Sequence, residues 1–475
     1  MAVLCLSFIL VACETDLGKK VEESVPTTEL PQGEDLFAAA AANDPTPVPF
    51  PDTGIPGFNF PEDSSVINAW IANRDEVAIH QHAWGIWTGL TKVIGKTCNG
   101  DNLRVFETWH DPEYLADRMQ GKPIATSGML ACGRPPLTMP SQFGHAVGVT
   151  GTTEGINDSI FESVVYSPAA AAYALENRIF SKQVQDSLYG AGVRNMKFPV
   201  NAITAKPVFK VIPRKQIDQG AYAIEVWPGP VTPPAPVPED SWNNYAYVIK
   251  DDSQPHDGLP DGSVYTLADF IHFELTEDDI TYFESEFFSE DSKDDFSVGD
   301  YAILVGMHVS SREAFRWTWQ TFYWTPNPDQ PTLPSSPLIA SLRPRQLTGA
   351  PAHYALTAAY NMIWPAQPYV GGQSVGEPIY SYNPYLEAPF TEGTLGSSPV
   401  TLPNGKIIDN KYGIQTNCMS CHIQATVIPT GSSAKHTNPY RANTYISMDD
   451  EFFRGKLMTD FAYSVGATTF SDTLK

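Results

Sequence analysis

The stretch YAILVGMHVSSREAFRWTWQTFYW, residues 301–324, does most to set the fold class of this chain. Residues 301–310 and 315–324 are rich in β-branched and aromatic side chains, and the short connection between them predicts a β-hairpin. In the second arm, aromatic residues such as Trp317 and Trp319 alternate with mostly polar ones, which predicts a strand buried on one face. Further short strands of similar composition are predicted at 208–212, 221–227 and 245–249.

Helical patterns precede these strands. Residues 66–74 have helical spacing, and residues 83–90 are apolar on more than one side, which predicts a buried helix. Residues 105–109 are expected to form a short extended segment. The expected class is therefore α+β, with a large antiparallel β-rich body to which helices are added.

The composition limits the functions this chain can have. Its 475 residues are 42% apolar and 12% aromatic, as in a packed globular protein. The formal net charge of −24 argues against nucleic acid as a partner, because phosphate binding needs clustered Lys and Arg. It argues equally against adsorption to an anionic membrane surface.

The N-terminus resembles a bacterial lipoprotein signal. An apolar run ends in Leu-Val-Ala-Cys at Cys13, which predicts a signal peptide at 1–12 and a lipid on Cys13. Residues 1–12 contain no Lys or Arg, which departs from the usual basic start. The acidic and then Pro-rich residues 13–57 are expected to form a tether. The resemblance implies a periplasmic or outer-membrane lipoprotein that touches the membrane only through its lipid.

The motif that carries chemistry is Cys418-Met419-Ser420-Cys421-His422. In a Cys-x-x-Cys-His sequence two thiols add across the vinyl groups of haem, and the adjacent His binds the iron. The segment is similar to mono-haem cytochromes c, which implies one haem c attached at Cys418 and Cys421 with His422 as proximal ligand. It also implies a small all-α domain at 396–475, with a terminal aromatic-faced helix expected after a capping box at Ser447.

The ligand on the other side of the iron is left open by the sequence. Met448, at the start of the expected terminal helix, is favoured. The alternative is that the protein leaves this position open, which would favour an enzyme over an electron carrier. The other candidate ligands are Met458, His436, His308 and His353.

Two rival interpretations of the Cys-x-x-Cys pair are weaker. A zinc site needs four ligands, and only His436 lies near the motif in sequence. A redox dithiol is expected between a buried strand and a helix, whereas residues 410–417 are polar. Of the remaining cysteines, Cys5 falls in the signal peptide, and Cys98 and Cys132 are predicted to form a disulfide.

The expected organisation is a signal peptide (1–12), a tether (13–57), a β-rich body (58–395) and a haem domain (396–475). The segment 228–240 would divide the body if it holds two subdomains. The favoured function is electron transfer with a redox partner that is basic at its docking surface. The alternative is a haem-dependent oxidase, oxygenase or peroxidase whose substrate the aromatic-rich body holds, with no catalytic residue identified. A third interpretation makes the body a ligand-binding module and the haem a sensor.

Overall fold

A computed structural model describes residues 46–98, 100–122, 133–138, 160–255, 257–286, 296–365, 374–435 and 440–471. These residues belong to one compact unit, Pro45–Lys475. The predicted signal peptide, the lipidation site Cys13, Cys132 and His436 lie outside the described residues. No helix in the described part of the chain is long and apolar enough to cross a membrane.

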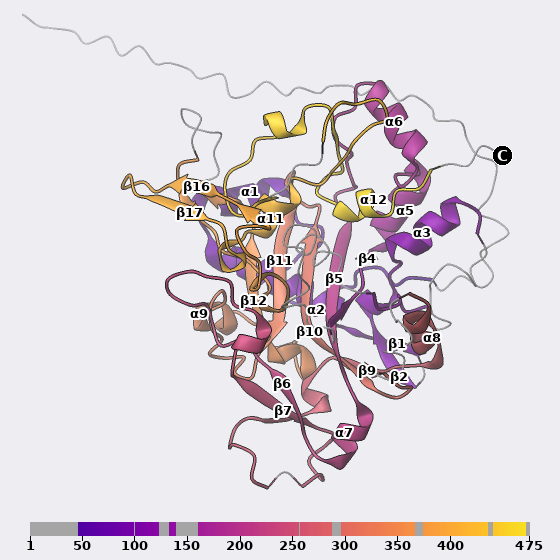
Figure 1. Cartoon of the computed structure of the whole chain (residues 1–475), viewed down its shortest axis with the longest axis vertical. Coiled ribbons are helices and arrows are strands. Elements are labelled where there is room, and N and C mark those ends of the chain that lie inside the picture. Colours follow the sequence, from indigo (N-terminus) through magenta and orange to yellow (C-terminus); the bar gives the residue numbers. More distant parts are fainter. Residues whose placement is uncertain are drawn as a thin grey trace, which may run out of the picture. The chain divides into compact units, whose positions relative to one another are not determined.

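A seven-stranded antiparallel sheet organises the molecule (Figure 1). Its main path runs β12-β11-β10-β5-β3, with β4 also paired to β5 and β9 to β10. The predicted hairpin is its centre, and the sheet confirms an α+β class. The strands of this sheet are β3 (Ile160–Glu162), β4 (Val165–Tyr166), β5 (Ile203–Ile212), β9 (His272–Glu274), β10 (Tyr301–Ser311), β11 (Thr318–Trp324) and β12 (Tyr354–Ala359).

Smaller sheets and helices surround the central one. The strands predicted at 221–227 and 245–249 pair with each other as β6 and β7. The smaller strands up to residue 378 are β1 (Val93–Cys98), β2 (Asp101–Arg104), β6 (Tyr222–Glu225), β7 (Tyr245–Ile249), β8 (Val264–Thr266), β13 (Ile363–Trp364) and β14 (Glu377–Pro378). The helices up to residue 387 are α1 (Ser64–Asn73), α2 (Glu76–Leu90), α3 (Pro112–Met119), α5 (Pro168–Asn177), α6 (Lys182–Gly190), α7 (Arg214–Gln219), α8 (Glu277–Glu286), α9 (Pro337–Ser341) and α10 (Pro384–Glu387).

Helix α2 covers one face of the central sheet. Its N-terminus is capped by Asp75, whose side chain accepts from the Ala78 amide. Its last two turns are buried, as predicted, and the ring of Trp87 stacks on Phe322 of β11 at a centroid distance of 4.3 Å. The Trp87 indole also donates to the Pro351 carbonyl at 2.9 Å. Stacked aromatic rings and a satisfied indole therefore fix this face of the sheet.

The C-terminal segment, defined as residues 374–471, lies against the opposite face. Asn383 donates to Thr321 Oγ1 at 3.0 Å, and Thr321 projects from β11 on the side opposite to Phe322. Strand β11 is consequently buried along its whole length. The prediction of a strand buried on one face only was wrong, because the second layer comes from residues far away in the sequence.

Two other local predictions were wrong. Residues 105–109 do not form an extended segment, because Val105–Thr108 is a short 3-10 helix in which the Glu107 side chain accepts from the Arg104 amide. The predicted tether does not reach residue 57. The Val48 carbonyl accepts from the Trp109 indole at 2.8 Å, and the Phe50 ring lies beside Gly89 of α2. Residues 46–57 therefore pack on the body.

The C-terminal segment is not the expected all-α domain. A 3-10 turn at Glu451–Phe453 replaces the terminal helix expected after Ser447. Gly455 lies at a φ of 77°, which ends the turn before a helix can continue. The elements of this segment after α10 are β15 (Leu395–Gly396), β16 (Ser398–Thr401), β17 (Ile407–Asn410), α11 (Cys418–His422), β18 (Thr426–Val427), β19 (Tyr440–Arg441), β20 (Leu457–Met458) and α12 (Tyr463–Ala467).

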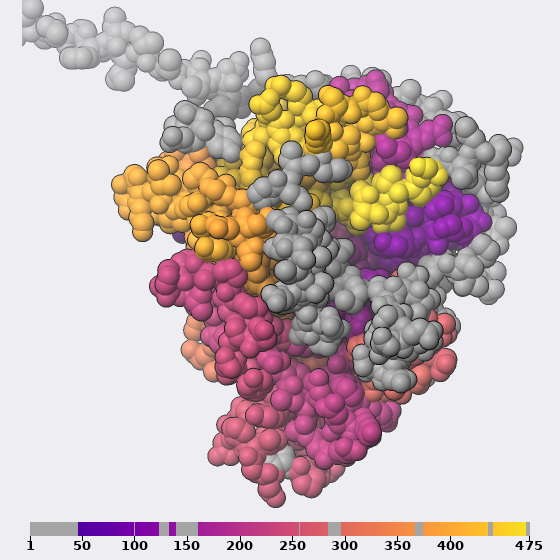
Figure 2. Space-filling model, viewed as in Figure 1, coloured from indigo at the N-terminus to yellow at the C-terminus, as the bar shows by residue number. Residues whose placement is uncertain are grey.

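This segment is interwoven with the body and not set apart from it. Phe470 forms a β-bridge with Ser181 and Met458 forms one with Asn195, so two parts of the segment pair with the body on either side of α6. Figure 2 shows the orange and yellow C-terminal residues gathered over the upper part of the molecule in this view.

Candidate functional site

The site is built around α11, the single helical turn that contains the Cys-x-x-Cys-His motif. Asn417 caps its N-terminus, and its Oδ1 accepts from the amides of Met419 at 2.9 Å and Ser420 at 3.2 Å. The amide group of the same side chain donates to the carbonyls of Asn361 at 3.0 Å and Ile379 at 2.9 Å. One buried side chain therefore starts the helix and attaches it to two other parts of the chain.

The two thiols of α11 are free, and they do not form a disulfide with each other. Cys418 is buried and its Sγ donates to the Ser381 carbonyl at 3.2 Å. Cys421 is partly exposed, and burial of its sulfur raises the pKa of the thiol to about 12. A redox-active dithiol needs the opposite shift, toward a thiolate at neutral pH. A buried 3-10 turn, Gly413–Gln415, precedes the motif where such an enzyme would have a strand.

The His422 imidazole is held in one orientation. Its Nδ1 lies 3.0 Å from the carbonyl oxygen of Phe461, so Nδ1 carries the proton and donates it to that bond. The other nitrogen, Nε2, is then left with its lone pair. Burial lowers the pKa of His422 to about 4, which keeps the ring neutral at pH 7. A neutral imidazole whose second nitrogen is hydrogen-bonded to a carbonyl is the usual state of a metal-binding histidine.

Aromatic rings enclose His422 from two elements. Trp319 of β11 lies against it with centroids 4.3 Å apart, and Tyr463 of α12 approaches edge-on at 5.2 Å. The Tyr463 hydroxyl also donates to the Cys421 carbonyl at 2.9 Å. The central sheet therefore contributes directly to the surroundings of the motif, which the sequence did not indicate.

A row of polar side chains on the sheet lies beside Cys418. Lys206 of β5 and Thr321 of β11 flank His308 of β10 in direct register, so all three side chains project from the same face. His308 Nε2 donates to Glu387 Oε1 at 2.9 Å and lies within hydrogen-bonding reach of the Cys418 thiol. Burial disfavours the imidazolium, but Glu387 and Cys418 together outweigh it and raise the pKa of His308 to about 10.

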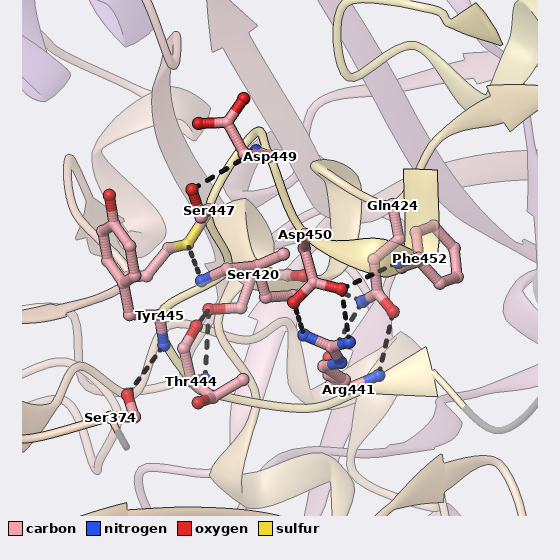
Figure 3. A network of polar contacts seen from close by, with 12 residues as sticks. Ser374, Ser420, Gln424, Arg441, Thr444, Tyr445, Ser447, Asp449, Asp450 and Phe452 are labelled. Atoms are coloured by element: carbon pink, nitrogen blue, oxygen red, sulfur yellow. Dashed lines mark hydrogen bonds and ion pairs between the residues drawn. The ribbon is translucent and has the colours of Figure 1, made fainter. Parts of the chain in front are cut away.

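Hydrogen bonds also fix the chain that follows the motif (Figure 3). Ser420, inside α11, donates to the Thr444 carbonyl at 2.9 Å. Gln424 donates to the carbonyls of Ser420 at 2.9 Å and Arg441 at 3.2 Å. Arg441 in turn forms a bidentate ion pair with Asp450 at 2.8 and 3.0 Å. These bonds connect α11 to residues 441–450 of the chain that follows it.

The structure separates the candidates for a second iron ligand. His308 lies at the motif, beside Cys418. His353 lies at the far end of the β11–β12 ladder, where it pairs with Asp269 at 3.3 Å. Met458 is buried in β20, which pairs with β18, and Met448 is half-buried against the hydrophobic cluster that contains Cys418. Met448 as ligand stays a prediction.

Other predicted sites have mixed outcomes. Cys98 is disulfide-bonded, and its predicted partner Cys132 lies outside the described residues. Within the described ranges, no group of three or more His, Cys, Asp or Glu side chains is arranged to hold a metal ion. Haem iron needs only one or two side chains of the protein as ligands, because the porphyrin supplies the others.

Several contributors to the site were missed, among them the rings of Trp319 and Tyr463 beside His422. The Phe461 carbonyl and Glu387 have no sequence signal, since each depends on a tertiary contact. Asn417 could have been predicted from the sequence, because Asn is a favoured N-cap residue and Asn417 directly precedes the motif.

Comparisons of the chain with protein-family models, with curated proteins and with solved structures found no match.

Proposed function

We propose that this protein is a c-type haem protein in which Cys418 and Cys421 form thioethers with one haem and His422 is the proximal ligand of its iron. The observation that carries the proposal is the 3.0 Å bond from His422 Nδ1 to the Phe461 carbonyl, which leaves Nε2 free to bind a metal. Two free thiols on the same helical turn support it.

The residues of α11 fit the requirements of such attachment. Each thiol adds its S–H across one vinyl double bond, so both thiols must be reduced and lie on the same turn. Cys421 and His422 are partly exposed and Cys418 is buried, so a haem would approach the motif from the side of Cys421 and His422. Bound haem iron supplies a one-electron ferric–ferrous couple.

Electron transfer is the first function proposed for this group. The aromatic rings of Trp319 and Tyr463 around His422 form an apolar wall that restricts water on that side. The acidic surface implied by the net charge of −24 would attract a partner that is basic at its docking surface. The lipid anchor at Cys13 belongs to the same proposal, and Cys13→Ala is expected to release the protein from the membrane fraction.

Haem-dependent oxidoreduction is the second candidate function, and it is favoured by an acid–base pair beside the motif. The pair His308–Glu387 lies beside Cys418, with Lys206 in the neighbouring register position of the sheet. A site used only for electron transfer has no need of a half-buried acid–base pair next to its haem.

The deciding experiment is co-expression of the full chain with a cytochrome c maturation system, followed by pyridine haemochrome spectroscopy. The wild type is expected to carry covalent haem, and the double variant Cys418→Ala, Cys421→Ala to carry none. Met419→Leu is the matched control, because it changes a buried neighbour and keeps both thiols and His422. Covalent haem in the double variant would disprove the proposal.

The same preparation separates the two functions. A ferrous spectrum that carbon monoxide leaves unchanged indicates a six-coordinate iron and supports electron transfer. A ferrous spectrum that carbon monoxide shifts indicates an open or weakly held position and supports the oxidoreductase.

A further inference from the structure

The carbonyl that holds His422 belongs to an unusual turn, residues 459–462. The Ala462 amide donates to the Thr459 carbonyl at 3.0 Å, which closes a β-turn. Its two central residues, Asp460 and Phe461, have φ values of 49° and 73°. Positive φ at both central positions is the signature of a type I′ turn, in which the second position is usually Gly. A bulky Phe in this conformation is uncommon and has to be held by its surroundings.

Hydrogen bonds to Asp460 stabilise this conformation, and we call the set of its partners, Arg312, Asn195 and the Phe198 amide, the clamp. Its fully buried carboxylate accepts from Arg312 Nε at 2.8 Å, from the Phe198 amide at 2.9 Å and from Asn195 Nδ2 at 3.4 Å. The Asp460 amide donates back to Asn195 Oδ1 at 3.1 Å. These partners come from the hairpin after β10 and from the chain between α6 and β5. The left-handed conformation is therefore fixed from outside the C-terminal segment.

The ends of the turn are fixed as well. Thr459 donates from its amide to the Ala425 carbonyl at 3.1 Å and from its hydroxyl to the Ala462 carbonyl at 2.8 Å. The side chain of Phe461 is buried and lies 6.1 Å from the Trp319 ring. With both ends and both central residues constrained, the Phe461 carbonyl has one direction available, and His422 Nδ1 lies along it.

We propose that Asp460 is the positioning residue of the site: clamped by Arg312 and Asn195, it holds the left-handed 459–462 turn that aims the Phe461 carbonyl at His422 Nδ1 and so keeps Nε2 unprotonated for iron. This inference rests on the proposed function for its purpose, but the tautomer it assigns to His422 does not depend on haem.

The test measures that tautomer in the full chain purified without haem. Long-range proton–nitrogen spectra of ¹⁵N-histidine-labelled protein at pH 7 distinguish protonated from bare ring nitrogens, and His422→Gln identifies the His422 signals. In the wild type the Nδ1–H form should exceed the Nε2–H form by about tenfold, as one hydrogen bond provides. Asp460→Ala should reduce this ratio to near unity, whereas Asp460→Asn, which tolerates positive φ and still accepts a bond, should retain most of it.

Asp450→Ala is the matched control, because Asp450 is also paired with an arginine, Arg441, in the C-terminal segment but makes no contact with the 459–462 turn. It should leave the His422 tautomer ratio unchanged. If Asp460→Ala does not fold, Asn195→Ala replaces it, with the same expected fall in the ratio. An unchanged ratio in the folded variant overturns the inference.

A second readout uses the protein loaded with haem. Loss of the Nδ1 bond makes the imidazole a weaker donor to iron, so Asp460→Ala should shift the ferric–ferrous equilibrium about tenfold toward ferrous with haem still covalently attached. Failure of the two proposals can be told apart. Absence of covalent haem from the wild type disproves the proposed function, whereas an unchanged tautomer ratio disproves only the role of Asp460.

Discussion

The central sheet and the C-terminal segment are stabilised in different ways. Strands β5 and β10 pair over ten register positions, whereas β18 and β20 in the C-terminal segment pair over two. The C-terminal segment instead depends on side-chain hydrogen bonds from residues such as Asn417, Gln424 and Arg441. Backbone ladders and apolar packing therefore maintain the fold, and a few polar side chains determine the geometry of the site. Single substitutions should reveal this division.

The largest loss of stability is expected where helix α2 packs on the central sheet. Trp87→Ala removes a fully buried ring that stacks on Phe322 and should lower the free energy of unfolding by about 4 kcal/mol. Trp87→Phe, the control, keeps the stacking and should cost about 1 kcal/mol through the lost bond to Pro351. Urea denaturation measures both. A cost below about 1 kcal/mol for Trp87→Ala would contradict the assignment of stability to this layer.

Asn417→Ala should cost somewhat less, about 3 kcal/mol, because it removes a helix cap and leaves buried carbonyls without donors. Unlike Trp87→Ala, it should also disturb the site and reduce covalent haem attachment. Asn417→Asp keeps the cap but turns a buried carboxylate oxygen toward the carbonyls of Asn361 and Ile379, so its cost should be no smaller than that of Asn417→Ala. Equal haem yields in wild type and Asn417→Ala would show that the cap does not set the geometry of α11.

His308→Gln should cost about 2 kcal/mol at neutral pH and alter the pH dependence of stability. Burial lowers the pKa of His308, but Glu387 and Cys418 together raise it from 6.5 to about 10. Its contribution is therefore complete below pH 6.5 and is lost as the pH rises toward 10. Unfolding measured across this range in the haem-free protein should show a decline in the wild type that is much flatter in His308→Gln. Parallel curves would refute the ion pair.

Arg441→Ala should have the smallest effect, about 1 kcal/mol, since the Arg441–Asp450 pair is partly exposed and screened by salt. The loss should shrink in high salt, which thermal melts can follow. A salt-independent loss would mean that Arg441 acts through packing.

The sequence predicted the sheet better than the site, for a physical reason. Strand composition and helical spacing report local burial, and they located β7 at 245–249 and the buried turns of α2 correctly. The burial of both faces of β11 depends on a layer supplied by residues 374–471, which no local pattern encodes. The motif residues of α11 were singled out because Cys-x-x-Cys-His is the spacing that covalent haem attachment requires, and that role remains a proposal.

The parts of the site that escaped prediction act through the backbone or across long distances. The Phe461 carbonyl could belong to any residue type, so only the turn geometry places it. The expected helix after Ser447 had an aromatic face, but Asp450 pairs with Arg441 and Gly455 adopts positive φ. Tertiary ion pairing and one glycine thus overrode a reasonable local pattern.

The attachment of α11 to Asn361, Ile379 and Ser381 has a consequence for modularity. A fragment starting at residue 396 would contain the complete motif but would lack all three of these anchoring residues. Removing residues 396–475 from the chain would expose Trp319 and the rest of a sheet face that is otherwise covered. Neither piece is a unit that could be exchanged between proteins or grafted onto another scaffold. In gene fusion or domain recombination, residues 46–471 have to be transferred together.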